Sequence, residues 1–228
     1  MPKLKPETEQ ARRQHILDAA ERCFARGGFH GTTMQHICKE ASVSPGALYV
    51  YFDSKEALIA GLCERDRAEL TERLESVAEA PDFLAALTAI GETYFREDPV
   101  AKRRIVVEMG LEATRNPRVA EVFLGTDKFC MGAFEELFRR LKAEGRIDPA
   151  YDVGTIAKVF FLIGDGLLWR RACIPDFDVR EVLPILTAMI GGIVRPVEQQ
   201  AGADRSADTV VPAAHKAFGQ TSSSEVRS

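Results

Sequence analysis

Residues 42–58, SVSPGALYVYFDSKEAL, decide how the first quarter of the chain folds. The opening three residues are long enough only for a tight turn, and Ser44 can cap a helix whose first position holds Pro45. Proline is tolerated there because the N–H group that it lacks would have no partner inside the helix. The segment therefore predicts a turn followed by a short helix from about Pro45 to Phe52.

Two further helices are predicted before this turn and one after it. Residues 8–26 carry apolar side chains at three- and four-residue steps, and Gly27-Gly28 ends that pattern. Thr32-Thr33 can cap a second helix that ends near residue 41, and Asp53 or Ser54 can cap a connector helix from about residue 54. Residues 1–55 therefore read as a three-helix domain.

Helical patterns continue over the rest of the chain. They span about 82–96, 100–114, 118–144, 153–173 and 179–194, with prolines at or just before their starts. No stretch alternates long enough to predict a strand. We expect an all-α chain of about nine helices, in which residues 56–195 form a second, larger domain. Residues 196–228 contain few large apolar side chains, which predicts a disordered tail.

Composition bounds the class of protein. A hydrophobic content of 46% in 228 residues is enough for a substantial core. The net charge is -4, but residues 1–55 hold eight Lys and Arg against six Asp and Glu, so that part carries +2 and the remainder -6. This asymmetry is a weak indication of a phosphate-binding face near the N-terminus.

The five cysteines are widely spread without a CxxC pair, and we interpret them as reduced packing residues. Neither they nor the four histidines have the spacing of metal ligands, so no metal or cofactor is expected. The chain also lacks an apolar signal region and any unbroken apolar run of about 18 residues. We therefore expect a cytoplasmic protein with no membrane partner.

The short helix at 45–52 has two different faces. At about 100° per residue, Leu48 and Phe52 lie within about 40° of each other and form an inward anchor. The outward face consists of small or aliphatic residues with a tyrosine on each flank: Gly46, Ala47 and Val50, flanked by Tyr49 and Tyr51. If both tyrosines were core residues, their hydroxyls would need partners on opposite sides of an eight-residue helix, an arrangement that is harder to satisfy.

Two short helices joined by a tight turn and braced by a third form a helix-turn-helix, whose second helix enters the DNA major groove. A phosphate strand runs along each side of a helix in that groove. Flanking phenols can therefore donate to phosphate oxygens while small central residues let the helix approach the bases. The predicted helix 45–52 has this distribution of side chains.

The segment GGFHGTTMQHICKEASVSPGALYVYFDSKEALIAGL resembles the DNA-binding region of TetR/AcrR-type transcriptional regulators. The resemblance covers about residues 10–62 and rests on these positions: Gly27, Thr33, Val43, Ser44, Gly46, Leu48, Tyr49, Tyr51, Phe52, Lys55 and Leu58. Ser42 departs from the pattern, since the family usually has glycine in the turn and serine is less comfortable in a strained one. Pro45 and Val50 are less polar than in many relatives.

The resemblance implies a set of DNA contacts. The candidates are Thr33, Gln35, Ser44, Pro45, Gly46, Ala47, Tyr49, Val50, Tyr51 and Lys55, with Thr33, the tyrosines and Lys55 on the phosphate backbone. Gln35 can pair bidentately with adenine, whereas Val50 can only contact a thymine methyl, so specificity also depends on DNA shape. Alternatively, Lys55 stabilises the start of its own helix, and His36 is either a contact residue or merely exposed.

The resemblance also implies that the second domain binds a small effector and forms a homodimer. Residues 152–171 and 178–194 combine apolar faces with small residues that allow close helix approach. They resemble the last two family helices, which pair with their copies, although they could instead close the core of the monomer. A dimer places two recognition helices on major-groove faces separated by about 34 Å or a multiple of it, which matches a palindromic operator.

Aromatic and polar residues of the second domain are candidates for the effector pocket: Tyr94, Phe95, Arg104, Glu108, Met109, Phe123, Phe134, Phe138, Phe161, Asp165 and Trp169, with Glu112 as a further polar group. For each aromatic taken singly, ordinary core packing is the favoured interpretation. A largely apolar pocket suits an aromatic or amphiphilic compound.

The sequence thus predicts a ligand-responsive repressor that is not an enzyme and that leaves its operator DNA when an effector binds, as efflux-pump regulators do. One alternative is a helical adaptor that binds protein, and another is an enzyme. The chain lacks a phosphate-cradling glycine motif, a metal-ligand cluster and a recognisable nucleophile with its base. A steep salt dependence of DNA binding would separate the regulator from the adaptor.

Overall fold

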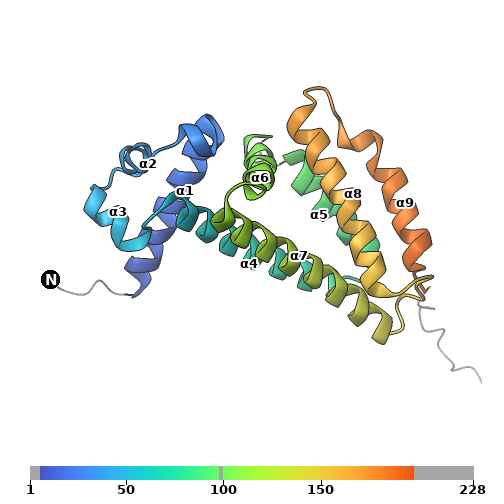
Figure 1. Ribbon diagram of the computed structural model, residues 1–228. Helices are drawn as coiled ribbons and strands as arrows, with labels where there is room; N and C mark the ends of the chain where they lie inside the picture. Colours follow the sequence, from blue (N-terminus) through green and yellow to red (C-terminus); the bar gives the residue numbers. More distant parts are fainter. Residues whose placement is uncertain (1–5, 98–99, 198–228) are drawn as a thin grey trace, which may run out of the picture. The chain divides into compact units, whose positions relative to one another are not determined.

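The structure is a computed structural model that describes residues 6–97 and 100–197. Within these ranges the chain forms nine α-helices and no strand. Figure 1 shows how the helices are arranged. The helices are α1 (Pro6–Gly31), α2 (Met34–Glu40), α3 (Pro45–Tyr51), α4 (Lys55–Glu79), α5 (Phe83–Glu92), α6 (Val100–Ala113), α7 (Pro117–Ala143), α8 (Val153–Cys173) and α9 (Leu183–Val194). The predicted all-α class is confirmed.

The helix α1 is longer than predicted because it continues past a break at Gly28. That residue has φ 68 and ψ 177, outside the helical region, and helical structure resumes up to Gly31. A positive φ is readily adopted only by glycine. The Gly27-Gly28 pair therefore interrupts the helix where expected but does not end it.

The helix-turn-helix follows from two side-chain caps. The Thr33 hydroxyl accepts a hydrogen bond from the His36 N–H at the start of α2, and the Ser44 hydroxyl accepts one from the Ala47 N–H at the start of α3. Each cap satisfies a backbone donor that has no partner within its helix. Phe52 ends α3 in an extended conformation, and Ser54 rather than Asp53 caps α4.

Two hydrophobic clusters share α4. The N-terminal cluster contains α1–α3 residues together with Leu58, Ile59 and Leu62 of α4, and it also takes in Met109 of α6 and Val119 of α7. The second cluster is built on the far end of α4 and on α5, α7, α8 and α9. Along its length α4 packs beside α7, as Figure 1 also shows. α4 begins at residue 55, where the sequence predicted a domain boundary, and the N-terminal cluster continues past it into α4, α6 and α7. The division into two domains stays a prediction.

Two predicted helices are divided in the structure. Residues 82–96 form α5 followed by a π-helical turn, η1 (Thr93–Glu97). Residues 179–194 form a 3₁₀ turn, η2 (Val179–Glu181), before α9. Pro184 lies in the first turn of α9, where its missing N–H is harmless, whereas inside one continuous helix it would break a hydrogen bond.

The beginning of the predicted tail is ordered. Ile147 and Pro196 form an isolated antiparallel bridge, and the Val197 N–H donates to the Arg146 carbonyl at 2.8 Å. Residues 198–228, which make up the rest of that tail, lie outside the described residues. In the part of the chain that the structure describes, no helix is both long and apolar enough to cross a membrane.

Candidate nucleic-acid interface

The short helix α3 has one buried and one exposed face. Leu48 is fully buried and Phe52 nearly so, whereas Val50 is 78% exposed. Gly46 is exposed, and a Cβ added there would meet nothing within 4 Å. The outer surface of α3 is therefore slim and apolar, and it is anchored through Leu48 and Phe52 to the N-terminal cluster.

The two tyrosines of α3 are not equivalent. Tyr49 is 52% exposed, whereas Tyr51 is half-buried and packs against the N-terminal cluster. Neither is a fully buried core residue. Tyr49 is consequently the phenol of this helix with the greater freedom to contact a partner in solution.

The start of α2 presents polar groups beside this face. Besides the Thr33 cap, the Thr33 N–H donates to His36 Nδ1 at 3.3 Å, which completes a reciprocal capping box. Nδ1 accepts this bond only in the tautomer that carries its proton on Nε2. Thr33, Gln35 and His36 are all exposed. The sequence did not suggest this capping role of His36.

The turn between α2 and α3 contains Ser42 at φ 53, in the left-handed region. Its N–H donates to the Lys39 carbonyl at 3.3 Å, and the Val43 N–H donates to the Cys38 carbonyl at 3.0 Å. The turn thus forms with serine where the family pattern has glycine, at a conformational cost of order 1 kcal/mol.

Lys55 has a structural role that was not predicted. Its ammonium donates to the Phe29 carbonyl at 2.5 Å and lies 4.3 Å from the centre of the Phe29 ring. An ammonium has three donors, so this contact uses only one of them. Lys55 therefore ties the start of α4 to the end of α1.

A group of charges joins α1 to α2. Arg22 and Arg26 donate to the two carboxylate oxygens of Glu40 at 2.7 and 2.5 Å. The hydrogen bonds from Arg26 and Arg22 lower the pKa of Glu40 from 4.5 to about 2. This contact holds α2, and with it the start of the turn, against α1.

The predicted effector residues are distributed over different hydrophobic clusters and the surface. Glu108, Met109 and Phe123 belong to the junction with the first domain: Met109 and Phe123 pack in the N-terminal cluster, and Glu108 accepts a hydrogen bond from the Phe29 N–H. Glu112 likewise points to this junction, since its carboxylate contacts His30 and Arg115.

The remaining predicted effector residues divide between core and surface. In the second cluster, the rings of Phe134 and Phe138 pack against Phe160, and Phe161 packs against Phe134. Asp165, Trp169 and Arg104 are exposed, although Arg104 also donates to the Ala172 carbonyl. Helical periodicity indicates which residues face inward, but not which of two cores they enter.

Tyr94 and Phe95 lie next to a charged residue that the sequence did not single out. The two rings meet edge to face at 4.8 Å, and the buried Arg103 guanidinium lies 3.5 Å from the centre of the Tyr94 ring. Burial lowers the pKa of Arg103 and raises that of Tyr94. Only the neighbouring Arg104 was predicted, because no local signal distinguishes the two positions.

Among the described residues, no group of three or more His, Cys, Asp or Glu side chains is placed to hold a metal ion.

Comparisons with known proteins point to the part of the chain that contains α2 and α3. A family profile described as bacterial regulatory proteins, tetR family, matches residues 16–62. The HTH-type transcriptional regulator UidR of Escherichia coli K12 is 30% identical over 188 residues, which cover 81% of this chain and 94% of that protein.

Solved structures extend the similarity to the whole fold. Salmonella enterica GusR has a TM-score of 0.68 and 29% identity, covering 81% of this chain and 96% of its own. The regulator FadR from Bacillus subtilis, solved in complex with stearoyl-CoA, has a TM-score of 0.64 over 81% of this chain and 99% of its own; at 20% identity it shows the fold alone. Since the similarity to UidR covers 81% of this chain and the profile match includes the helix-turn-helix, the chain belongs to the TetR family of bacterial HTH-type transcriptional regulators.

Proposed function

We propose that this regulator is a repressor that binds a palindromic operator as a homodimer and is released by a small aromatic or amphiphilic effector. The observation that carries the proposal is the division of α3, in which Leu48 and Phe52 are buried while Val50 and Tyr49 are exposed. A short helix with a slim outer surface fits the major groove, which is about 12 Å wide.

The exposed groups suggest different tasks. Gln35 at the start of α2 is the candidate reader of an adenine edge, and Val50 is the candidate contact to a thymine methyl group. Thr33 keeps its hydroxyl hydrogen for an outside acceptor because its oxygen already accepts from His36. Thr33 and Tyr49 are thus suited to phosphate oxygens, while Ser44 is committed to the cap of α3.

Lys55 and Tyr51 contribute in a less direct way. Lys55 retains two N–H donors beyond its bond to Phe29, so it can contact a phosphate while holding α4 to α1. Tyr51 packs against the N-terminal cluster with part of its surface exposed. Pro45, Gly46 and Ala47 complete the candidate surface as small groups at the start of α3.

The proposed dimer interface is the exposed apolar face of α8 and α9. Val159, Leu162 and Trp169 follow one another along α8 at helical spacing, and Ile185 and Met189 do so along α9. Large exposed side chains in such a row are unusual on a monomer and are typical of an interface. A second copy of the chain would cover them and bring two α3 helices to one operator.

The proposed effector response is a shift between two states of this dimer. α6 contacts α1 through Glu108 and His30–Glu112, so a ligand that displaces α6 also displaces the helix that supports α2. An effector that favours the non-binding state by about 3 kcal/mol would weaken operator binding on the order of a hundredfold. FadR with stearoyl-CoA shows a protein of this fold holding an amphiphilic molecule.

The test begins with selection of bound duplexes from a random-sequence DNA library. We expect palindromic sites, a steep loss of affinity with rising salt, and two chains per site by light scattering. Val50→Glu places a charge in the groove and should abolish binding without changing thermal stability. Leu124→Glu is the matched control, because Leu124 is 61% exposed but lies on α7.

A reporter gene behind the selected site then distinguishes repression from activation. Repression requires that the intact protein lower expression and that Val50→Glu restore it. Salt-independent binding, or equal DNA affinity of Val50→Glu and Leu124→Glu, would contradict the proposed interface.

A further inference from the structure

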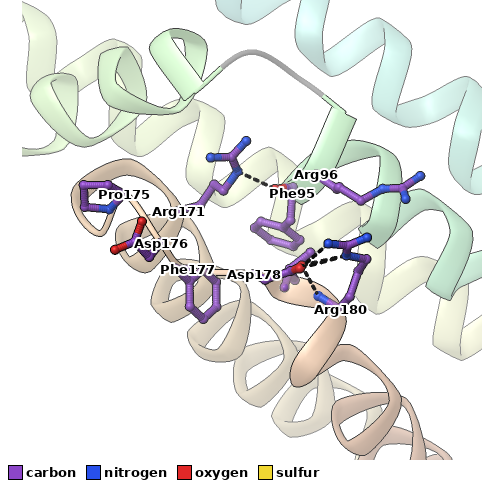
Figure 2. A pocket seen from close by; sticks show the side chains of 9 residues that line it. Phe95, Arg96, Arg171, Pro175, Asp176, Phe177, Asp178 and Arg180 are labelled. Atoms are coloured by element: carbon purple, nitrogen blue, oxygen red, sulfur yellow. Dashed lines mark hydrogen bonds and ion pairs between the residues drawn. The ribbon is translucent and has the colours of Figure 1, made fainter.

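A hollow of about 490 Å³ lies between η1 and the segment that joins α8 to α9. The residues that line it are Phe95, Arg96, Arg171, Pro175, Asp176, Phe177, Asp178, Val179 and Arg180. Figure 2 labels all of them except Val179. The volume of the hollow is within the range of about 300–1,000 Å³ that is typical of small-molecule sites. Apart from Phe95, none of these residues was among the predicted effector contacts. We call it the arginine hollow.

The chain builds one wall of this hollow by ending α8. Pro175 follows the last turn of α8 and prevents its continuation, and the Phe177 N–H donates to the Ile174 carbonyl at 3.3 Å to form a turn. The Asp178 carboxylate then accepts from the Arg180 N–H at 3.0 Å and caps η2. Phe177 and Val179 bury part of this segment in a third small cluster.

Arg171 is held in place by a bond that leaves its outer nitrogens available. Its Nε donates to the Phe95 carbonyl at 2.9 Å, a contact visible in Figure 2. This bond orients the guanidinium and leaves the two terminal NH₂ groups, whose fork matches the oxygens of a carboxylate or phosphate. The side chain is half-buried, so less water competes for these donors than on an open surface.

One of the two acids that line the hollow is already bound. Arg180 Nε donates to Asp178 at 2.8 Å, so this aspartate does not compete with an anion for Arg171. Hydrogen bonds from Arg180 lower the pKa of Asp178 to about 2, so this pair stays ionised at neutral pH. Asp176, at the exposed edge, is the second acid.

Two aromatic side chains supply the apolar part of the lining. Phe95 and Phe177 are half-buried, and both pack against the third cluster, which contains Leu167, Val179 and Leu183. We infer that the arginine hollow binds a small organic anion, with its carboxylate or phosphate on Arg171 and its apolar body against Phe95 and Phe177. The inference deepens the proposed function, on which it rests for the identification of this anion as the effector.

The position of the hollow connects it to the DNA-binding domain. Phe95 and Arg96 belong to η1, which ends at Glu97, and α6 begins at Val100. α6 in turn holds α1 through Glu108. A single π-helical turn is rare and is frequently found at functional positions. An anion bound to η1 is therefore well placed to bias the start of α6.

The experiment is calorimetric titration of the full-length protein with benzoate and with phenyl phosphate, and with benzamide as the uncharged analogue. We expect at least one anion to bind with saturation in the millimolar range or tighter, and benzamide to bind at least tenfold more weakly. The tighter of the two anions identifies the head group. Arg171→Gln should weaken binding tenfold or more, whereas Arg170→Gln, the same charge change on the exposed neighbour, should leave it unchanged.

If circular dichroism shows that Arg171→Gln does not fold, Asp176→Asn provides a second test of anion binding. Removing the competing carboxylate should strengthen anion binding two- to threefold, and Phe177→Ala should weaken it. Equal binding of benzoate and benzamide, equal behaviour of Arg171→Gln and Arg170→Gln, or no saturation by either anion would overturn the assignment.

Operator binding, measured separately by fluorescence anisotropy, distinguishes the anion site itself from its role as the effector site. Anions that bind through Arg171 and also release the operator support both the site and its effector role. Anions that bind without releasing DNA confirm the site and overturn its effector role. A protein that binds no operator but does bind the anion refutes the proposed repressor and leaves the arginine hollow standing.

Discussion

The carboxylate of Glu108 accepts a hydrogen bond of 2.8 Å from the backbone N–H of Phe29, beside the break that Gly28 makes in α1. The carbonyl of the same Phe29 accepts from Lys55 at 2.5 Å. A broken helix leaves backbone groups without partners, and here an acid from α6 and a base from α4 supply them. This one residue thus connects α1 to both α4 and α6.

Gly28→Ala should destabilise the protein by about 2 kcal/mol or more. Its φ of 68 is unfavourable for alanine, and the new Cβ would lie 2.9 Å from both carboxylate oxygens of Glu108. Urea unfolding measures the change. Gly31→Ala is the control, because a Cβ added there would meet nothing within 4 Å and its φ is not positive, so a change within about 0.5 kcal/mol is expected. Equal effects of the two substitutions would contradict this account.

Ser42→Gly should stabilise the protein, in contrast to Gly28→Ala. Glycine relieves the left-handed φ of 53 in the turn and should stabilise the protein by up to about 1 kcal/mol. Ser44→Ala, two residues away, should destabilise it by about 1 kcal/mol, because the hydroxyl that caps α3 is lost. Thermal unfolding of both variants is sufficient, and a destabilising Ser42→Gly would show that the turn is not strained.

Tyr49→Phe should weaken operator binding by about two- to tenfold, similarly for all operator sequences, because one hydrogen bond to phosphate is lost. Tyr151→Phe is the control, since Tyr151 is also exposed but lies just before α8. Fluorescence anisotropy with the selected duplex measures both. If Tyr49→Phe binds as tightly as Tyr151→Phe, the phenol makes no contact that matters.

At acidic pH, Glu40 should no longer contribute to the stability of the fold. Its folded pKa of about 2 lies below its ordinary value of 4.5, so the bonds to Arg26 and Arg22 stabilise the fold above pH 4.5. This contribution is lost as the pH falls from about 4.5 through about 2. Glu40→Gln should therefore lower the melting temperature near neutral pH, and the difference from the natural sequence should shrink toward pH 2.

A double-mutant cycle with Arg26→Gln isolates this contact from other acid effects. The coupling between Glu40 and Arg26 should be measurable near neutral pH and absent at the acidic end. A coupling that does not change with pH would show that the pair is not responsible.

Leu162→Glu should convert the proposed dimer to a monomer and reduce operator affinity by at least tenfold, because a charge would be buried between two copies of α8. Leu111→Glu is the control, since Leu111 on α6 is 62% exposed and Leu162 is 70% exposed. Sedimentation velocity gives the oligomeric state. If Leu162→Glu is still a dimer, or if Leu111→Glu is a monomer, the dimer interface does not lie on α8.

The sequence predicted those parts of the fold that depend on local chemistry. Ser44 and Pro45 place the start of α3, and α8 spans Val153–Cys173, the range that its helical pattern predicted. These signals lie within a few residues of the element that they determine, so one sequence is enough to interpret them. The exposed side of α3 followed from helical geometry for the same reason.

The rest depends on contacts between distant residues. Phe29 and Glu108 are 79 positions apart, and no local pattern indicates that an acid of α6 satisfies a break in α1. The same applies to Arg171, which approaches Phe95 from 76 positions away. The effector residues stay a prediction because periodicity gives the inward face of each helix but not the partner of that face.

The sharing of α4 between two clusters limits how this regulator can be rebuilt. A hybrid that joins the first 55 residues to a foreign sensor would leave behind Leu58, Ile59 and Leu62, which close the N-terminal cluster from α4, and Met109 and Val119, which close it from α6 and α7. The first 55 residues therefore cannot be transferred to another protein as a self-contained DNA-binding unit. A hybrid protein that folds must keep these five side chains or replace them with side chains of similar shape.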